Sequence, residues 1–187
     1  GFSGLPALAE EVIIARDIML AESSGARLHI AHISTAKSLE LVSQAKHKGL
    51  PVTCEVTPHH LVLNEEAVLG FDTNTKMKPP LRSDKDRLAC VEALKNGLID
   101  CIATDHAPHA DFEKEKEFDH APFGIIGLET AFPVLYKQLV LSGQLSLERL
   151  VEAFSSAPAK VLGLPGGSLD EGKAADLTII DLNKETL

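Results

Sequence analysis

Five of the eight histidines follow three short apolar stretches, at positions where a strand would end. They are His32, His59, His60, His106 and His109. An aspartate, Asp105, comes directly after the third stretch. Imidazole nitrogens and carboxylate oxygens are ligands that zinc accepts readily, and a zinc-bound water loses its proton near neutral pH. These residue types therefore predict metal-assisted hydrolysis at the strand ends.

Asp105 and His32 are the two leading candidates for this chemistry. Burial of a carboxylate directly after an apolar strand is costly unless a metal, a cation or several hydrogen bonds compensate. We therefore expect Asp105 to touch a metal and to move a proton, with a loop-capping carboxylate as the alternative. Strand alternation places His29 and His32 on opposite faces, and His32, at the strand exit, is the better ligand candidate. The alternative for His32 is a hydrogen-bonded core residue.

Three further histidines of these segments allow two interpretations each. His109 follows Asp105 across Pro108, which favours extended backbone before it. It could donate a hydrogen bond to an anionic substrate, or it could be a surface residue. His59 and His60 are adjacent on an expected strand end, so at most one of them would reach the site, and packing is the alternative role.

The elements that would position these residues alternate along the chain. Apolar spacing predicts a helix from Pro6 to Ser24 and two or three more between Leu128 and Gly163. Strand-like stretches followed by helical patterns occur at residues 27–34, 51–56 and 99–103. Three such units predict a parallel sheet and an α/β fold. Active sites lie at the carboxyl ends of the strands in both barrels and doubly wound sheets, which is where the histidines fall.

Composition limits the classes of function. The chain has 187 residues, 44% hydrophobic and 24% charged, as in a globular domain. Its net charge of −9 makes nucleic acid and anionic membrane surfaces improbable partners. No apolar run approaches the roughly 20 residues of a membrane span, and the opening residues lack signal features, so we expect a cytoplasmic protein. The three cysteines form no C-x-x-C pair and are expected to be buried thiols.

The charged stretch from Asp111 to Asp119 (DFEKEKEFD) predicts a solvated loop, with a lid beside the site as the alternative.

Six motifs occur in order along the chain. They are AHIST (31–35), EVTPHHL (55–61), KMKPPLR (76–82), ATDHAPH (103–109), PFGIIGLET (122–130) and GxxADL (172–177). Together they resemble dihydroorotases of the bacterial type I class, in the amidohydrolase superfamily, over essentially the whole chain.

The resemblance implies roles for five residues. His32 matches the metal-ligand histidine after the sixth barrel strand. Asp105 matches the aspartate after the eighth strand that binds metal and acts as the acid and base. His109 matches a residue that contacts the substrate carboxylate, and Phe123 and Gly124 match a loop whose backbone meets the pyrimidine ring.

The resemblance also implies a reaction and a cofactor. The reaction is the reversible hydrolysis of the cyclic amide of dihydroorotate to N-carbamoyl-aspartate in pyrimidine biosynthesis, with one or two zinc ions. Lys78 stands where the family motif more often has an asparagine that contacts the ring, so it is expected either to pair with a substrate carboxylate or to point outward. Two alternatives are another cyclic amidohydrolase, such as an allantoinase or hydantoinase, and a non-catalytic subunit that scaffolds aspartate transcarbamoylase.

The fold implied is the C-terminal part of a (β/α)8 barrel, which typically takes about 250 residues. Residues 1–164 would supply about three βα units, and residues 165–187 a strand of a small β domain. The family's other ligands, an H-x-H pair, a bridging Lys or Asp and a further histidine, would lie upstream. We therefore expect the 187 residues alone to be inactive and to expose a sheet edge and apolar faces that pair with a partner or with another copy, as in a homo-oligomer.

Overall fold

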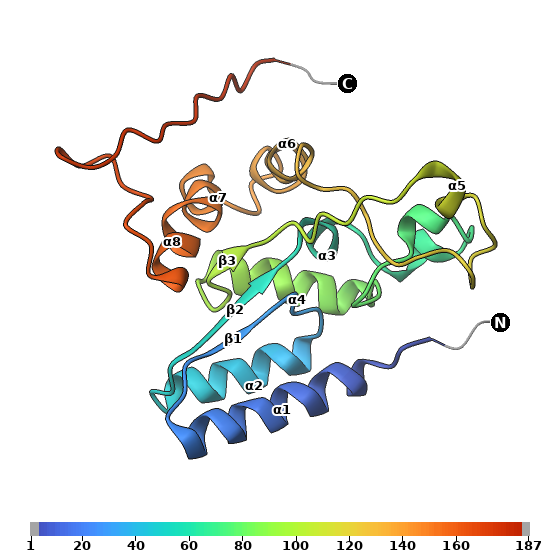
Figure 1. Cartoon of the computed structure of the whole chain (residues 1–187), viewed down its shortest axis with the longest axis horizontal. Coiled ribbons are helices and arrows are strands. Elements are labelled where there is room, and N and C mark those ends of the chain that lie inside the picture. The colour runs from blue at the N-terminus through green and yellow to red at the C-terminus, as the bar shows by residue number, and fades with distance from the viewer. Residues whose placement is uncertain (1–3, 185–187) are drawn as a thin grey trace.

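The computed structural model describes residues 4–184 and contains a three-stranded parallel sheet (Figure 1). The strands are β1 (Leu28–Ile30), β2 (Val52–Val56) and β3 (Cys101–Ile102), in the order β1-β2-β3. In the register, His29 pairs with Thr53 across β1 and β2. The expected α/β fold with parallel strands is confirmed. All three carboxyl ends therefore lie at one edge of the sheet.

Helices connect and cover the strands. The α-helices are α1 (Ala7–Ser24), α2 (Ala36–His47), α3 (Pro58–Val62), α4 (Asp84–Lys95), α5 (Asp111–Lys114), α6 (Ala131–Leu135), α7 (Leu147–Phe154) and α8 (Ser156–Leu162). Two 3-10 turns, η1 (Glu65–Val68) and η2 (Thr73–Thr75), and a π-helical turn, η3 (Tyr136–Val140), complete the set among the described residues. Thr35 and Ser83 cap α2 and α4, because each side-chain oxygen accepts a backbone N–H of the first turn. The caps fix where each helix begins after its strand or loop.

The core lies between the sheet and the helices α2 and α4. Val42 and Leu94 from these helices and Val56 from β2 are fully buried. The three cysteines are buried and free, as expected. Burial raises the pKa of Cys54 and Cys90 to about 12 and that of Cys101 to about 11. These thiols are therefore neutral packing groups at physiological pH.

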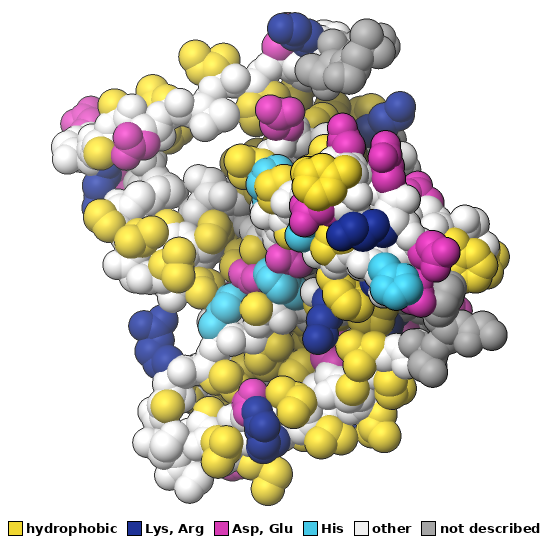
Figure 2. Space-filling model, turned by 45° about the vertical axis from the view of Figure 1, so that its right-hand side comes forward, with side chains coloured by type: hydrophobic (Ala, Val, Ile, Leu, Met, Phe, Trp, Pro, Cys, Tyr) yellow, Lys and Arg dark blue, Asp and Glu magenta, His cyan; other side chains and the backbone are white. Residues whose placement is uncertain are grey.

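Helix α1 buries only one side. Ile14 and Ile18 face the core, whereas Leu8, Met19 and Leu20 are each more than half exposed. Hydrophobic side chains cover much of the lower part of the face in Figure 2, at the height of α1 and α2. The expectation of uncovered apolar faces is confirmed.

The segment after α8 departs from the prediction. The expected strand over Leu177–Leu182 is absent, and its Ile179 is 95% exposed. A strand needs a hydrogen-bonding neighbour, and the backbone hydrogen bonds within residues 165–184 close local turns, such as the one from Lys184 N to Asp181 O. The rest of the expected small-domain segment, residues 185–187, lies outside the described residues.

Among residues 4–184, no helix combines the length and the apolar character that a membrane span requires.

Candidate metal centre and active site

The structure brings His32 and Asp105 together at the carboxyl edge of the sheet. His32 follows β1 and Asp105 follows β3, and the atoms His32 Nε2 and Asp105 Oδ1 lie 3.7 Å apart. Both residues have positive φ angles, 54° and 48°, which are uncommon for residues other than glycine. Histidine and acidic side chains gather beside a hollow in the middle of the face in Figure 2. Strained backbone of this kind is often found at functional sites.

Glu55, on β2, joins two histidines and was not singled out from the sequence. Its Oε1 lies 3.0 Å from His32 Nδ1, and its Oε2 lies 3.1 Å from His29 Nε2. The prediction that His29 and His32 face opposite sides was wrong. Strand β1 ends at Ile30, and the positive φ of His32 turns its side chain back toward β2. The signal that could have found Glu55 is a carboxylate within an otherwise uncharged strand.

The electrostatics of this cluster follow from the same contacts. The Glu55 carboxylate, 3.0 Å from Nδ1, raises the pKa of His32 against the opposing effect of burial, and the charge of Asp105 raises it further. Burial raises the pKa of Glu55, but the hydrogen bonds and charges of His29 and His32 together lower it more, to about 2. Glu55 is therefore a carboxylate at neutral pH.

The pair His32 and Asp105 fits a metal such as zinc. Their separation of 3.7 Å is too long for a hydrogen bond. Two ligands that each lie about 2.0–2.1 Å from one tetrahedral zinc ion are about 3.4 Å apart, and an opening of the ligand–zinc–ligand angle by about 20° gives 3.7 Å. Zinc also takes imidazole nitrogen and carboxylate oxygen, so both distance and donor type agree. Three protein ligands are usual at a catalytic zinc, and this pair supplies two.

Two other groups of metal-ligating side chains lie close together in the described residues. His29, Glu55 and Cys101 are one group, and their ligand atoms lie within 4.8 Å of one another. The exposed residues Glu117, Asp119 and His120 form the second. Only the first of these adjoins His32, through Glu55.

His109 holds the loop that carries Phe123 and Gly124. Its Nε2 lies 2.9 Å from the carbonyl oxygen of Phe123, and a carbonyl only accepts, so Nε2 donates. A side chain at position 124 would be strained at a φ of 147° and would place Cβ 2.7 Å from the Ala107 carbonyl oxygen. The glycine therefore lets this loop lie against the segment that follows β3.

Lys78 is exposed but lies near the same loop. Its Nζ is 6.0 Å from the centre of the Phe123 ring, and both residues line a cavity of about 580 Å³. Lys76 is buried, and its Nζ donates to the carbonyl oxygens of Asp119 and Ala121. The lysine at position 76 thus braces the loop, whereas that at position 78 is accessible to a ligand.

His59 and His60 lie on helix α3 and both are buried, so the strand expected for them was wrong. His60 is satisfied locally, with Nδ1 2.6 Å from Thr57 Oγ1 and Nε2 3.1 Å from the Pro79 carbonyl oxygen. Burial lowers the pKa of His60 to about 4 and that of His59 to about 3. His60 therefore has a packing role. His59 Nε2 has no hydrogen-bond partner within residues 4–184.

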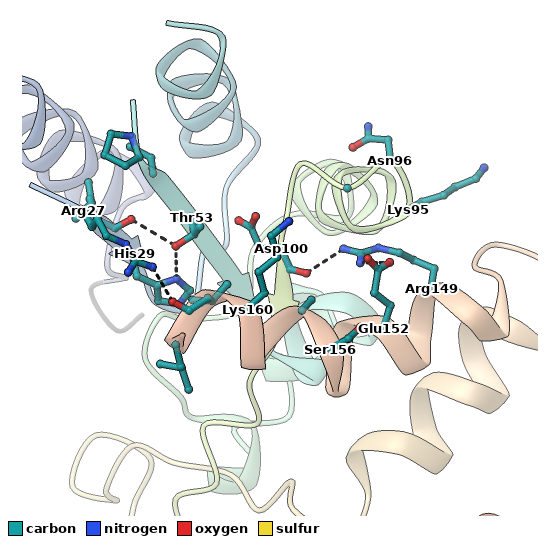
Figure 3. Close-up of a pocket in the computed structure, with 17 residues that line it drawn as sticks. Arg27, His29, Thr53, Lys95, Asn96, Asp100, Arg149, Glu152, Ser156 and Lys160 are labelled. Carbon is teal, nitrogen blue, oxygen red and sulfur yellow. Dashed lines mark hydrogen bonds and ion pairs between the residues drawn. The ribbon is translucent and has the colours of Figure 1, made fainter. Parts of the chain in front are cut away.

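A second hollow, of about 1000 Å³, lies toward the amino ends of the strands (Figure 3). Arg149 projects from α7, and its guanidinium donates to the carbonyl oxygens of Leu94, Ile99 and Asp100. The Asp100 side chain accepts from Lys46 Nζ and from the backbone N–H of Cys54. Arg149 and Asp100 thus bind backbone groups at this end of the sheet.

Comparisons with known proteins agree with the motifs. The sequence pattern of the amidohydrolase family matches residues 5–187. Dihydroorotase of Bacillus subtilis is 52% identical over 187 residues, which are all of this chain and 44% of that protein. Dihydroorotase of Pelotomaculum thermopropionicum is 55% identical over 181 residues, 97% of this chain and 42% of that protein. The chain thus spans less than half the length of these curated relatives.

Solved structures give the same fold. L-hydantoinase from Arthrobacter aurescens superposes with a TM-score of 0.86 and 36% identity, over 91% of this chain and 39% of that one. D-hydantoinase from Thermus sp. gives a TM-score of 0.85 with 30% identity, again over 91% and 39%. These matches confirm the expected α/β fold, as part of a barrel. The chain belongs to the amidohydrolase family.

Proposed function

We propose that this chain is the C-terminal part of a zinc-dependent dihydroorotase, which reversibly hydrolyses dihydroorotate to N-carbamoyl-aspartate. The observation that carries the proposal is the His32–Asp105 pair, 3.7 Å apart at the carboxyl edge of the sheet. The name dihydroorotase, borne by relatives at 52% and 55% identity, supports the choice of substrate.

The residues divide the chemistry between them. Zinc, when bound, would polarise the ring amide and lower the pKa of a water molecule. His32 and Asp105 would supply two of its ligands. The Asp105 carboxylate would also accept the proton of the attacking water and pass it to the leaving ring nitrogen.

Substrate recognition falls to the loops at the same edge. We assign the substrate carboxylate to His109, with the Lys78 ammonium as a second group that can reach it. The backbone of Phe123 and Gly124 would meet the pyrimidine ring. The contact between His109 Nε2 and the carbonyl oxygen of Phe123 supports these assignments, because it places the His109 imidazole beside the loop that would meet the ring.

A hydantoinase is the second candidate, favoured by the structural matches to L- and D-hydantoinase. The complete protein should be assayed for hydrolysis of dihydroorotate, hydantoin and allantoin under the same conditions. We expect dihydroorotate to have the largest kcat/KM. A larger value for hydantoin or allantoin would reject the proposal. We expect no turnover from the 187 residues alone.

Assembly is a further part of the proposal. The exposed apolar side of α1 is the surface we expect to be covered, either by another copy of the protein or by aspartate transcarbamoylase. A purely scaffolding role is disfavoured, because the His32 and Asp105 pair is intact. The mass of the complete protein in solution, measured with and without aspartate transcarbamoylase, distinguishes a homo-oligomer, a mixed complex and a monomer.

A further inference from the structure

A line of polar contacts runs from Thr53, on the middle strand β2, to His32. Thr53 and Glu55 lie on the same face of β2, because their positions differ by two. Thr53 Oγ1 lies 2.8 Å from His29 Nδ1 on the neighbouring strand, a contact drawn in Figure 3. His29 Nε2 lies 3.1 Å from one oxygen of Glu55, and the other oxygen lies 3.0 Å from His32 Nδ1.

The donors and acceptors along this line can be assigned from chemistry. A carboxylate only accepts hydrogen bonds, so His29 Nε2 carries a hydrogen and donates it to Glu55. His29 Nδ1 is then the acceptor of the Thr53 hydroxyl. Thr53 thereby orients His29, and the hydrogen bond from His29 Nε2 fixes the position of one Glu55 oxygen.

The same rule determines the state of His32. Its Nδ1 is buried and has no hydrogen bond of standard geometry in the described part of the chain. The Glu55 oxygen at 3.0 Å is the acceptor within reach, and a small rotation of the imidazole ring would align the N–H with it. With the hydrogen on Nδ1, His32 Nε2 keeps a lone pair. That lone pair faces the Asp105 carboxylate at 3.7 Å, so two electron-rich atoms face each other where a cation fits.

We propose that Glu55 is a positioning residue, which holds His32 by Nδ1 so that Nε2 presents its lone pair to the metal. His29 and Thr53 act through Glu55 by anchoring its second oxygen. The inference rests on the proposed function only in taking His32 as a metal ligand. Carboxylates placed in this way orient ligating histidines and typically change metal affinity about 10- to 100-fold.

A competing arrangement exists at the same carboxylate. His29, Glu55 and Cys101 could themselves hold a metal, since their ligand atoms lie within 4.8 Å of one another. In that arrangement Glu55 would be a ligand and Cys101 would be deprotonated. The two arrangements differ in whether a thiolate touches the metal.

The first test uses the complete wild-type protein, freed of metal and labelled with ¹⁵N in its histidines. The ¹⁵N shifts, recorded at a pH above which they no longer change, report which nitrogen of His32 carries the hydrogen. We expect the Nδ1–H form. The Nε2–H form would overturn the proposal, and this result requires no substitution.

The second test measures zinc affinity by competition with a chelator for the wild type, Glu55→Gln and Asp100→Asn. Glutamine keeps the shape but presents an NH₂ group to one of the two histidine N–H groups, so we expect the zinc Kd to rise about 10- to 100-fold. Asp100→Asn is the matched control, a carboxylate paired with a cation at the other end of the sheet, and should stay within about threefold. A Glu55→Gln protein that folds and binds zinc within threefold of the wild type would refute the role.

A third measurement separates the competing arrangement. Co²⁺ bound in place of zinc should show no thiolate charge-transfer band, and Cys101→Ser should leave its spectrum unchanged. A band that Cys101→Ser abolishes would overturn the proposal. If the complete protein fails to hydrolyse dihydroorotate, the proposed function is wrong, while the His32 tautomer and the zinc affinities still decide the role of Glu55.

Discussion

The two ends of the sheet use similar charged side chains in different ways. At the amino end, Arg149 and Asp100 each engage several backbone or side-chain partners, with N···O distances of 2.7–3.1 Å. At the carboxyl end, His32 and Asp105 face each other across 3.7 Å with positive φ angles. The amino end thus completes its hydrogen bonds within the chain, whereas the carboxyl end keeps ligand atoms available.

This difference separates stability from chemistry within one small sheet. Substitutions at the amino end should lower the free energy of unfolding and leave the chemistry intact. Substitutions of His32 and Asp105, at the carboxyl end, should lower activity and leave the free energy of unfolding close to that of the wild type, which matches the division between the two faces of barrel enzymes.

The largest effect is expected at Asp105. Asp105→Asn in the complete protein should lower kcat for dihydroorotate by about 10²- to 10⁴-fold, because an amide cannot accept and return the proton. The free energy of unfolding, measured with urea, should stay close to that of the wild type. Asp17→Asn, on the surface of α1, is the control and should keep full activity. Retention of more than about a tenth of the activity by Asp105→Asn would contradict its role.

His60 tests whether a histidine at the carboxyl end can serve stability and not metal binding or catalysis. Its folded pKa of about 4 lies below the ordinary 6.5, so the unfolded chain binds more protons between these values. Stability should be full above pH 6.5 and fall as the pH drops toward 4, by on the order of 3 kcal/mol from this residue.

Urea unfolding at pH 7 and at pH 4.5 measures this loss. His60→Gln, which has no titrating ring, should lose less stability between the two pH values than the wild type. His59, with its pKa of about 3, should account for part of the remainder. An equal loss in the variant and the wild type would show that His60 does not carry the effect.

Arg149 tests the amino end. Arg149→Met removes the guanidinium that donates to the carbonyl oxygens of Leu94 and Ile99 and should cost about 2 kcal/mol of unfolding free energy. The kcat/KM per folded molecule should be unchanged. Arg16→Met removes an exposed ion pair and should cost less than about 1 kcal/mol. A large loss of kcat/KM in Arg149→Met would contradict the claim that the amino end serves stability and not chemistry.

The smallest effect is expected at His109. His109→Ala should raise KM for dihydroorotate about tenfold with a smaller change in kcat, because one charge-assisted contact to the substrate is lost. His120→Ala, an exposed histidine of a neighbouring loop, should leave KM unchanged. An unchanged KM in His109→Ala would show that this residue does not hold the substrate carboxylate.

Much of the carboxyl end was predictable, since parallel strands must end at one edge and thereby bring the regions of His32 and Asp105 together. The contact between His29, Glu55 and His32 was not. It depends on β1 ending at Ile30 and on the positive φ of His32, and strand alternation alone indicates neither. The strand expected at Leu177–Leu182 also failed, because an apolar pattern cannot supply the neighbour that a strand needs.

The most direct test of the central claim is the zinc content of the complete protein. After equal dialysis against metal-free buffer, zinc per chain should be measured by elemental analysis for the wild type and for His32→Ala. We predict that His32→Ala loses at least one zinc ion per chain while its circular dichroism remains that of the wild type. Equal zinc content in the two proteins would contradict a metal centre at the carboxyl end of this sheet.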